Sequence, residues 1–252
     1  GVGTFGGSED HTEILNAKRA MLSIFQFCPT VHKADVAFPD DIAVVVAHSG
    51  VKAEKTREAM EKYNLVSKRA ALVVQAYNRK CGTSHSLMRE ITEENRGVET
   101  SVLLARVAEA TTGYREGEID LDLPGRFRQF YYEDQVIIPN AARFLINRDY
   151  ERLGETIDRS HHASKRYLWN IIPEIDFLQK SARRLGALAA SGFGAGFGGS
   201  AYALVRKGSE ESFSARWGEA YREGFPEHGT ACQFFTVSAS EKATELFPGT
   251  AP

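Results

Sequence analysis

The sequence predicts an α+β protein in which strands and helices follow one another without a regular βαβ alternation. The run Ile42–Ala47 is compact, apolar and rich in β-branched residues, which is typical of a strand. Between residues 53 and 79, apolar residues recur every three or four positions, the period of a helix. The helical and extended segments that follow come in irregular order, which favours an α+β sandwich over a doubly wound fold.

The N-terminal part is expected to consist mostly of strands. Residues 1–7 form a glycine-rich loop, and residues 13–20 are expected to form a short helix. Two strands are predicted at 21–27 and 31–38, separated by a turn at Cys28-Pro29-Thr30. A second turn then leads into the strand that begins at Ile42.

The rest of the chain is predicted to be mainly helical up to a glycine-rich run. The long helix 53–79 is followed by a polar loop with a short helix (81–98), a helical pair (99–112) and a break at Leu121–Gly125, where Pro124-Gly125 ends any helix. Helices are then predicted over 126–137, 141–147, 150–168 and from Pro173 on. After the glycine run, a strand is expected at 201–205, a helix at 210–222 and a last strand at 233–237.

Composition limits the class of protein. The 252 residues are 42% hydrophobic and 25% charged, as in ordinary soluble domains, and allow one large domain or two small ones. A formal net charge of −2 argues against bulk binding to nucleic acid. No apolar run approaches the ~20 residues that span a bilayer, so no membrane partner is expected. Three separated cysteines predict neither a disulfide scaffold nor a zinc site, and favour the cytoplasm.

The glycine run Gly192–Gly199 carries five glycines in eight positions. Such a run allows backbone N–H groups to converge on an anion, and only glycine lets a phosphate approach the backbone so closely. No Gly-Lys-Ser/Thr follows it, and it does not open a βαβ unit, so it matches neither a Walker loop nor a dinucleotide motif. Composition alone leaves a phosphate loop and a tight turn equally open.

The segment Phe193–Ser200, followed by an apolar strand, resembles the third conserved motif of the GHMP kinase superfamily and is most similar to that of galactokinases. Phe193 and Ala195 depart from the small residue and the glycine that are usual there. The resemblance implies that the loop lies beside the nucleotide phosphates and the sugar. The residues it assigns to the loop are Gly194, Gly196, Phe197, Gly198, Gly199 and Ser200.

The segment Gly6–Thr12 resembles the C-G-x-M-D-Q motif of galactokinases. The resemblance implies that Gly7 and Asp10 bind substrate and that Asp10 is the catalytic aspartate. Phosphoryl transfer to a sugar needs a carboxylate that accepts or orients the hydroxyl proton. The alternative is that Asp10 caps the helix that follows it. Glu9 and His11 replace the usual Met and Gln, which leaves the substrate open.

Three further segments resemble galactokinases in the same order. His48–Lys52 followed by Glu61–Asn64 resembles a strand end and helix whose tyrosine binds sugar, which implies that role for Tyr63; the alternative is a core residue. Arg126–Glu133 resembles the R-A-x-H-V-x-x-E segment, with surface ion pairs as the alternative. Ser160-His161 with Pro173–Asp176 resembles the S-H … P-E-L-D pattern, and we interpret His161 and His162 as structural.

The resemblance implies a GHMP kinase C-terminal, ferredoxin-like domain over residues 41–252, with an antiparallel sheet and packed helices. Residues 1–40 would be a remnant of the N-terminal kinase domain. It further implies an ATP- and Mg²⁺-dependent kinase acting on the anomeric hydroxyl of galactose or a related sugar.

The first two motifs of the family do not occur in these residues. The chain opens at Gly1 in a glycine-rich turn, so we expect an N-terminal segment to be missing, with a tag scar as the alternative. The missing half would hold Mg²⁺ and act as a partner, no metal ligands are predicted here, and the chain alone is expected to be inactive. The alternatives are a non-catalytic regulator that binds sugar and ATP, and one half of a split kinase.

Overall fold

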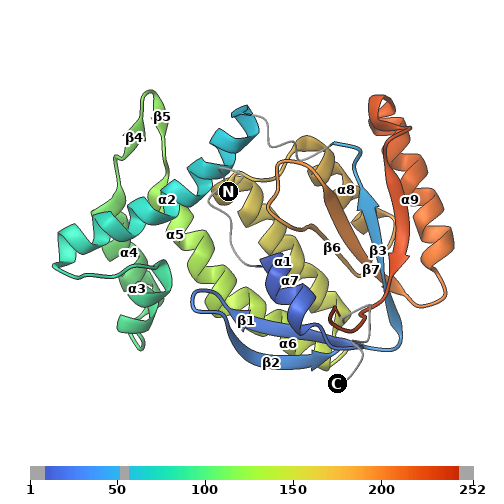
Figure 1. Ribbon diagram of the computed structural model, residues 1–252, viewed down its shortest axis with the longest axis horizontal. Helices are drawn as coiled ribbons and strands as arrows, with labels where there is room; N and C mark the ends of the chain where they lie inside the picture. Colours follow the sequence, from blue (N-terminus) through green and yellow to red (C-terminus); the bar gives the residue numbers. More distant parts are fainter. Residues whose placement is uncertain (1–8, 52–56, 244–252) are drawn as a thin grey trace, which may run out of the picture.

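The computed structural model describes residues 9–51 and 57–243, with side chains from residues 11 and 60 onward in the two ranges. One four-stranded antiparallel sheet organises the C-terminal part, in the spatial order β6-β7-β3-β8 (Figure 1). Its strands are β3 (Ile42–His48), β6 (Ala189–Gly192), β7 (Ser200–Arg206) and β8 (Gln233–Val237). With helices between β3 and β6 and between β7 and β8, this is the β-α-β-β-α-β order of ferredoxin-like folds.

Each face of the sheet has its own apolar core, because side chains alternate along every strand. Val45, Ala47 and Val205 face the helices α8 (Pro173–Arg184) and α9 (Glu210–Gly224). On the other face, Ile42 and Leu204 pack with α6 (Ile138–Ile146) and α7 (Tyr150–Ala163). The hairpin of β1 (Met21–Gln26) and β2 (Val31–Ala37) contributes Val36 to this second core and follows α1 (Glu9–Asn16).

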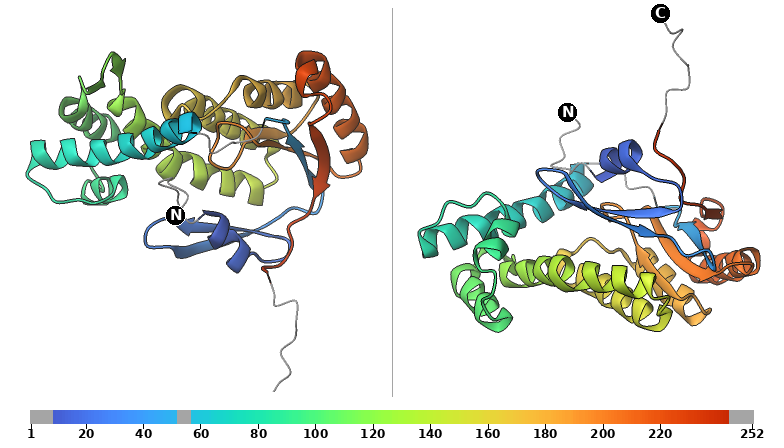
Figure 2. Two further views of the ribbon diagram at one scale, coloured as in Figure 1. Left: turned by 45° about the horizontal axis from the view of Figure 1, so that its top comes forward. Right: turned by 90° about the horizontal axis from the view of Figure 1, so that it is seen from below.

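A third core joins helices that extend away from the sheet. Figure 2 shows these helices at the opposite end of the molecule from α9. They are α2 (Arg57–Cys81), α3 (Met88–Glu94), α4 (Thr100–Thr111) and α5 (Leu123–Tyr132). Val73, Ile91, Leu103 and Phe127, one from each helix, are almost completely buried in it. Within the described ranges, no helix combines the length and apolar character that crossing a membrane requires.

The α+β class and the antiparallel sheet predicted from the sequence are confirmed, whereas several local predictions are wrong. Pro124-Gly125 lies in the first turn of α5, where proline needs no hydrogen-bond acceptor, and Asp122 caps this turn. Residues 100–111 form one helix instead of a pair. The helices predicted over 126–137 and 150–168 end in π-helical turns, η1 (Glu133–Ile137) and η2 (Ser164–Leu168).

Three short strands and one short helix were not predicted. The strands are β4 (Arg115–Glu116), β5 (Ile119–Asp120) and β6, and the helix is the 3₁₀ turn η3 (Pro226–His228). Strand β6 reads Ala-Ala-Ser-Gly, and such small residues give no β-branched or alternating signal. Its last residue, Gly192, is also the first residue of the glycine run.

Candidate functional site

The glycine run is the hairpin loop that connects β6 to β7. Gly192 is paired with Ala201 across the hairpin, so residues 193–199 form the connection. Positive φ angles occur at Gly194 (72°), Gly196 (85°), Phe197 (60°) and Gly199 (80°). These left-handed conformations cost side-chain-bearing residues free energy but are readily adopted by glycine, which explains why this loop is so rich in it.

Two flanking segments hold the loop. On one side, the Phe197 amide donates to the carbonyl of Asn170 (2.8 Å), which follows η2. On the other side, the Gly199 amide donates to the Val51 carbonyl (3.0 Å). The Gly199 carbonyl in turn accepts from both the amide (2.9 Å) and the hydroxyl (2.8 Å) of Ser49, just beyond β3. The loop is thus fixed between the end of β3 and the end of η2.

Other loop amides keep their donors available. Among the described residues, the amides of Gly194, Ala195, Gly196 and Gly198 donate to no protein acceptor. Around Gly194 and Gly199, a Cβ atom would meet no atom within 4 Å, so the backbone is open there to an approaching group. This combination of free donors and open backbone is the chemistry of an anion-binding nest.

Tyr63 lies against this loop. Its half-buried ring packs on Phe197 with 5.6 Å between the ring centroids and 46° between the ring planes. Because Tyr63 belongs to α2, the structure brings a residue predicted for sugar binding into contact with the predicted phosphate loop. The apolar stripe expected to include Tyr63 continues along α2 into the third core at Val73 and Tyr77.

The other predicted substrate-binding residues are less fully described. Gly7 lies outside the described residues. Asp10 lies in the first turn of α1, for which the backbone alone is described at this position. The helix predicted over 13–20 thus starts earlier, at Glu9, so Asp10 belongs to the helix instead of preceding it. The C-terminal segment crosses the end of this helix, where the Ala243 amide donates to the Ile14 carbonyl (2.8 Å).

Two of the remaining motif segments meet in the interior. The Ser160 hydroxyl donates to the Glu133 carboxylate (2.8 Å), and burial raises the pKa of Glu133. The alternative of a surface ion pair is therefore wrong for Glu133. His161 is 3% exposed and lies 3.6 Å from Asp176 (Nε2 to Oδ1), and burial lowers its pKa. Its Nδ1 lies 3.4 Å from both the Ser191 hydroxyl and the Gly192 amide at the start of the loop.

Sequence reasoning missed the residues that support the loop. Asn170 and Ser49 act through their contacts with a loop that lies far along the chain, and no local pattern indicates such pairs. Arg69 follows Lys68 in α2 and carries no predicted role, yet it is completely buried. A buried arginine has no signal in a helix whose exposed face is also basic.

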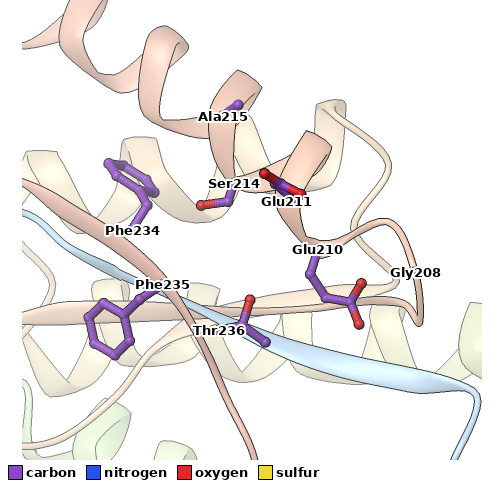
Figure 3. A pocket seen from close by; sticks show the side chains of 8 residues that line it. All are labelled: Gly208, Glu210, Glu211, Ser214, Ala215, Phe234, Phe235 and Thr236. Carbon is purple, nitrogen blue, oxygen red and sulfur yellow. The ribbon is translucent and has the colours of Figure 1, made fainter.

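The described surface also contains two hollows, and no residue predicted from the sequence for substrate or phosphate lines either of them. One, of about 610 Å³, lies between α9 and β8, where Phe234 and Thr236 point toward the helix (Figure 3). The other is a groove of about 1070 Å³ along α7, η2 and α8, with Lys165 and Lys180 both bound to Asp176 within it.

Comparison with known proteins agrees with this architecture. Residues 141–223 match the family model for GHMP kinases C terminal. The galactokinase of Thermococcus kodakarensis is 27% identical over 205 residues, which cover 81% of this chain and 50% of that protein. The galactokinase of Pyrococcus furiosus is 27% identical over 233 residues, covering 86% and 53%. The chain spans about half the length of these curated relatives.

A solved structure supports the fold. The chain aligns with Lactococcus lactis galactokinase, crystallised in complex with galactose, at a TM-score of 0.72 and 20% identity, covering 96% of this chain and 56% of that one. Residues 141–223 are thus similar in sequence to the C-terminal domain of GHMP kinases, and the whole chain has the fold of this part of a galactokinase. Within that class, the chain is galactokinase-like.

Proposed function

We propose that this chain supplies the C-terminal part of an ATP-dependent sugar 1-kinase. The reaction would transfer the γ-phosphate of ATP to the anomeric hydroxyl of galactose or a related sugar. Residues 1–40 would belong to the N-terminal kinase domain and residues 41–252 to the C-terminal one. Galactokinase relatives support a kinase in general, and the arrangement around the glycine loop supports the assignment of roles within the site.

The contact between Tyr63 and Phe197 carries the proposal. A tyrosine expected to bind sugar packs at 5.6 Å on the loop expected to lie beside the phosphates. Donor and acceptor of a phosphoryl group must be held close together and in line, and most of the catalysis comes from this positioning. One helix, α2, and one hairpin loop would therefore form the side of the site where sugar and nucleotide meet.

The loop fits a phosphate better than this part of the chain fits a metal. The amides of Gly194, Ala195 and Gly196, which donate to no acceptor in the described part of the chain, and the open backbone at Gly194 and Gly199 suit an anion. Within the described ranges, no group of three or more His, Cys, Asp or Glu side chains could hold a metal ion. The binding of Mg²⁺ would thus depend on residues other than these.

Asp10 would accept or orient the proton of the sugar hydroxyl as the phosphoryl group arrives. Asp10 is the second residue of α1, so it does not precede the helix as an N-cap would, although the helix dipole favours a carboxylate in the first turn. Asp10→Asn keeps the size of the side chain but accepts no proton, so it removes the proposed catalytic role and changes the first turn of α1 little.

The test is a coupled assay of ADP release with a panel of sugars: galactose, arabinose, fucose, glucuronic acid and N-acetylhexosamines. It uses the protein extended by the N-terminal half of the kinase, beside the 252-residue chain alone. We expect sugar-dependent turnover only with both halves, and a loss of about 10²-fold or more in kcat for Asp10→Asn without loss of stability. Sugar binding without turnover would instead indicate a regulator. Turnover by the chain alone, above its Asp10→Ala variant, would contradict the proposal.

A further inference from the structure

Arg69 is a completely buried cation with no carboxylate bonded to it among the described residues. Its guanidinium donates instead to backbone carbonyls of two separate segments. Nε bonds to Leu121 (2.7 Å) and Nη2 to Asp122 (3.1 Å), ahead of α5. Nη1 bonds to Tyr167 (2.7 Å), in the last turn of η2. Arg69 thus ties α2 to the end of η2.

The end of a helical segment suits this cation. The last carbonyls of a helix have no intrahelical partner and carry the negative end of its dipole, so a positive group beside them is stabilised. Burial lowers the pKa of Arg69 to about 10, which still leaves the guanidinium protonated at neutral pH. An apolar side chain here would leave the carbonyls of Leu121, Asp122 and Tyr167 without the donor that Arg69 supplies, so this one side chain joins both segments to α2.

Trp169 terminates η2 in contact with the same guanidinium. The Cζ atom of Arg69 lies 3.5 Å from the centroid of the indole ring, a close cation–π stack. The backbone of Trp169 is left-handed (φ 68°), a conformation that costs a residue with a side chain free energy. The stack and the carbonyl bonds from Arg69 offset that cost and fix the direction in which the chain leaves η2.

The next residue reaches the glycine loop. The carbonyl of Asn170 accepts the Phe197 amide at 2.8 Å. The fit is so close that a Cβ atom on Gly196 would lie 2.3 Å from that carbonyl oxygen. A continuous series of contacts therefore runs from Arg69 through Trp169 and Asn170 to Phe197. The same helix, α2, touches Phe197 directly through Tyr63.

We propose that Arg69 is a positioning residue of the glycine loop, acting through Trp169 and Asn170. It fixes the end of η2 so that the Asn170 carbonyl holds the loop in the conformation that exposes its free amides. The role of this conformation in binding phosphate rests on the function proposed above, whereas the series of contacts from Arg69 to the loop does not depend on it.

Amide hydrogen exchange, followed by NMR on this chain, tests the link. In Arg69→Met, we expect exchange at the Phe197 amide, bonded to Asn170, to accelerate at least about tenfold. The Gly199 amide, bonded to Val51 on the other side of the same loop, should stay within about twofold and serves as an internal reference. Equal acceleration of the two amides would overturn the proposal, because it would mean general loosening.

A matched control separates positioning from packing. Val73 lies one turn further along α2 and is completely buried in the third core without contributing to the series of contacts. Val73→Ala should lower stability without changing the ratio of Phe197 to Gly199 exchange, and a changed ratio would overturn the proposal. If Arg69→Met fails to fold, Trp169→Leu gives the same comparison, since it removes the stack and leaves Arg69 and α2 unchanged.

A 5-fluorotryptophan label adds a spectroscopic signature. The chain has two tryptophans, and Trp217 is buried against α8, away from this stack. Arg69→Met should shift the ¹⁹F resonance of Trp169 and leave that of Trp217 in place. An unshifted Trp169 resonance would show that the stack does not form.

The kinetic consequence is measured on the protein with both halves. Arg69→Met should raise KM for ATP about tenfold or more and change KM for the sugar less than about twofold, a split that general destabilisation would not produce. An unchanged KM for ATP, in an active enzyme, would overturn the role in positioning. If the wild-type protein with both halves shows no turnover, the proposed function is contradicted. The hydrogen-exchange result would still test the link from Arg69 to the loop, because it does not depend on activity.

Discussion

A methyl group at Gly196 would have no room. The Cβ would lie 2.3 Å from the Asn170 carbonyl oxygen, and the backbone there has φ of +85°. At Gly194, φ is +72°, but nothing lies within 4 Å of the added atom. Comparing the two positions separates steric overlap from backbone strain. Both have a left-handed backbone, but only Gly196 has the overlap.

We therefore expect Gly196→Ala to cost about 2–3 kcal/mol of unfolding free energy and Gly194→Ala about 1 kcal/mol, measured by urea denaturation. Equal losses in the two variants would contradict this, because they would show that the loop moves away from Asn170 at little cost.

His161 gives the stability a pH dependence of known sign. Burial lowers its pKa in the folded state, against an attraction from Asp176. Below about pH 6.5, the unfolded chain therefore binds a proton that the folded chain does not, and stability falls with the pH. Above that pH, the imidazole is neutral in both states and has no effect.

The prediction concerns the difference in Tm between wild type and His161→Gln. That difference should be constant from pH 8 to 7 and should shift in favour of the variant as the pH falls from 6.5 to 5. Comparing the two proteins at each pH removes the contribution of Glu133, whose raised pKa acts in the opposite direction. A constant difference down to pH 5 would contradict the assignment.

Among the elements, α5 starts with a cap that the sequence did not suggest. Asp122 has φ of 40°, and its carboxylate accepts the Gly125 amide at 3.0 Å. Asp122→Ala loses the cap and places alanine in a left-handed conformation, so we expect a loss of about 1–2 kcal/mol in urea denaturation. Asp122→Asn retains both the cap and the tolerance of this backbone and should lose less than about 0.5 kcal/mol. Similar losses in the two variants would assign the effect to the charge beside Arg69.

The elements also show how far sequence reasoning reaches. Periodicity predicted α2, and compact apolar runs predicted the strands β3 and β7, because these patterns are visible within each segment. Strand β6 escaped because its four small residues carry no pattern, and the start of α5 was misjudged because proline ends a helix but also begins one. In the site, the motif resemblance assigns Tyr63 and the glycine loop to the same site, and the contact of Tyr63 with Phe197 agrees with this. It assigns no role to Arg69 or Asn170, because their contacts join residues that are far apart in the sequence.

At the scale of the molecule, two lobes meet at the candidate site. The helical core of α2 to α5 lies on one side and the sheet with its two cores on the other (Figure 1). The glycine loop, η2 and α2 lie where these lobes join, so the site depends on packing in both. The division into domains at residues 40 and 41 stays a prediction, and β2 already shares the core of α6 and α7 through Val36.

The way in which the glycine loop is held also determines where the chain can accept extra residues. Its two ends are in register with neighbouring strands, Gly192 opposite Ala201 and Ser200 opposite His48, and the amides of Phe193, Phe197 and Gly199 have fixed acceptors. A single inserted residue would have to break one of those hydrogen bonds, so we expect the loop not to tolerate a change in its length. Gly117, at the tip of the β4–β5 hairpin, is exposed, and a Cβ atom there would meet no atom within 4 Å, which makes this tip a suitable place for a fluorophore, an epitope or a fused domain.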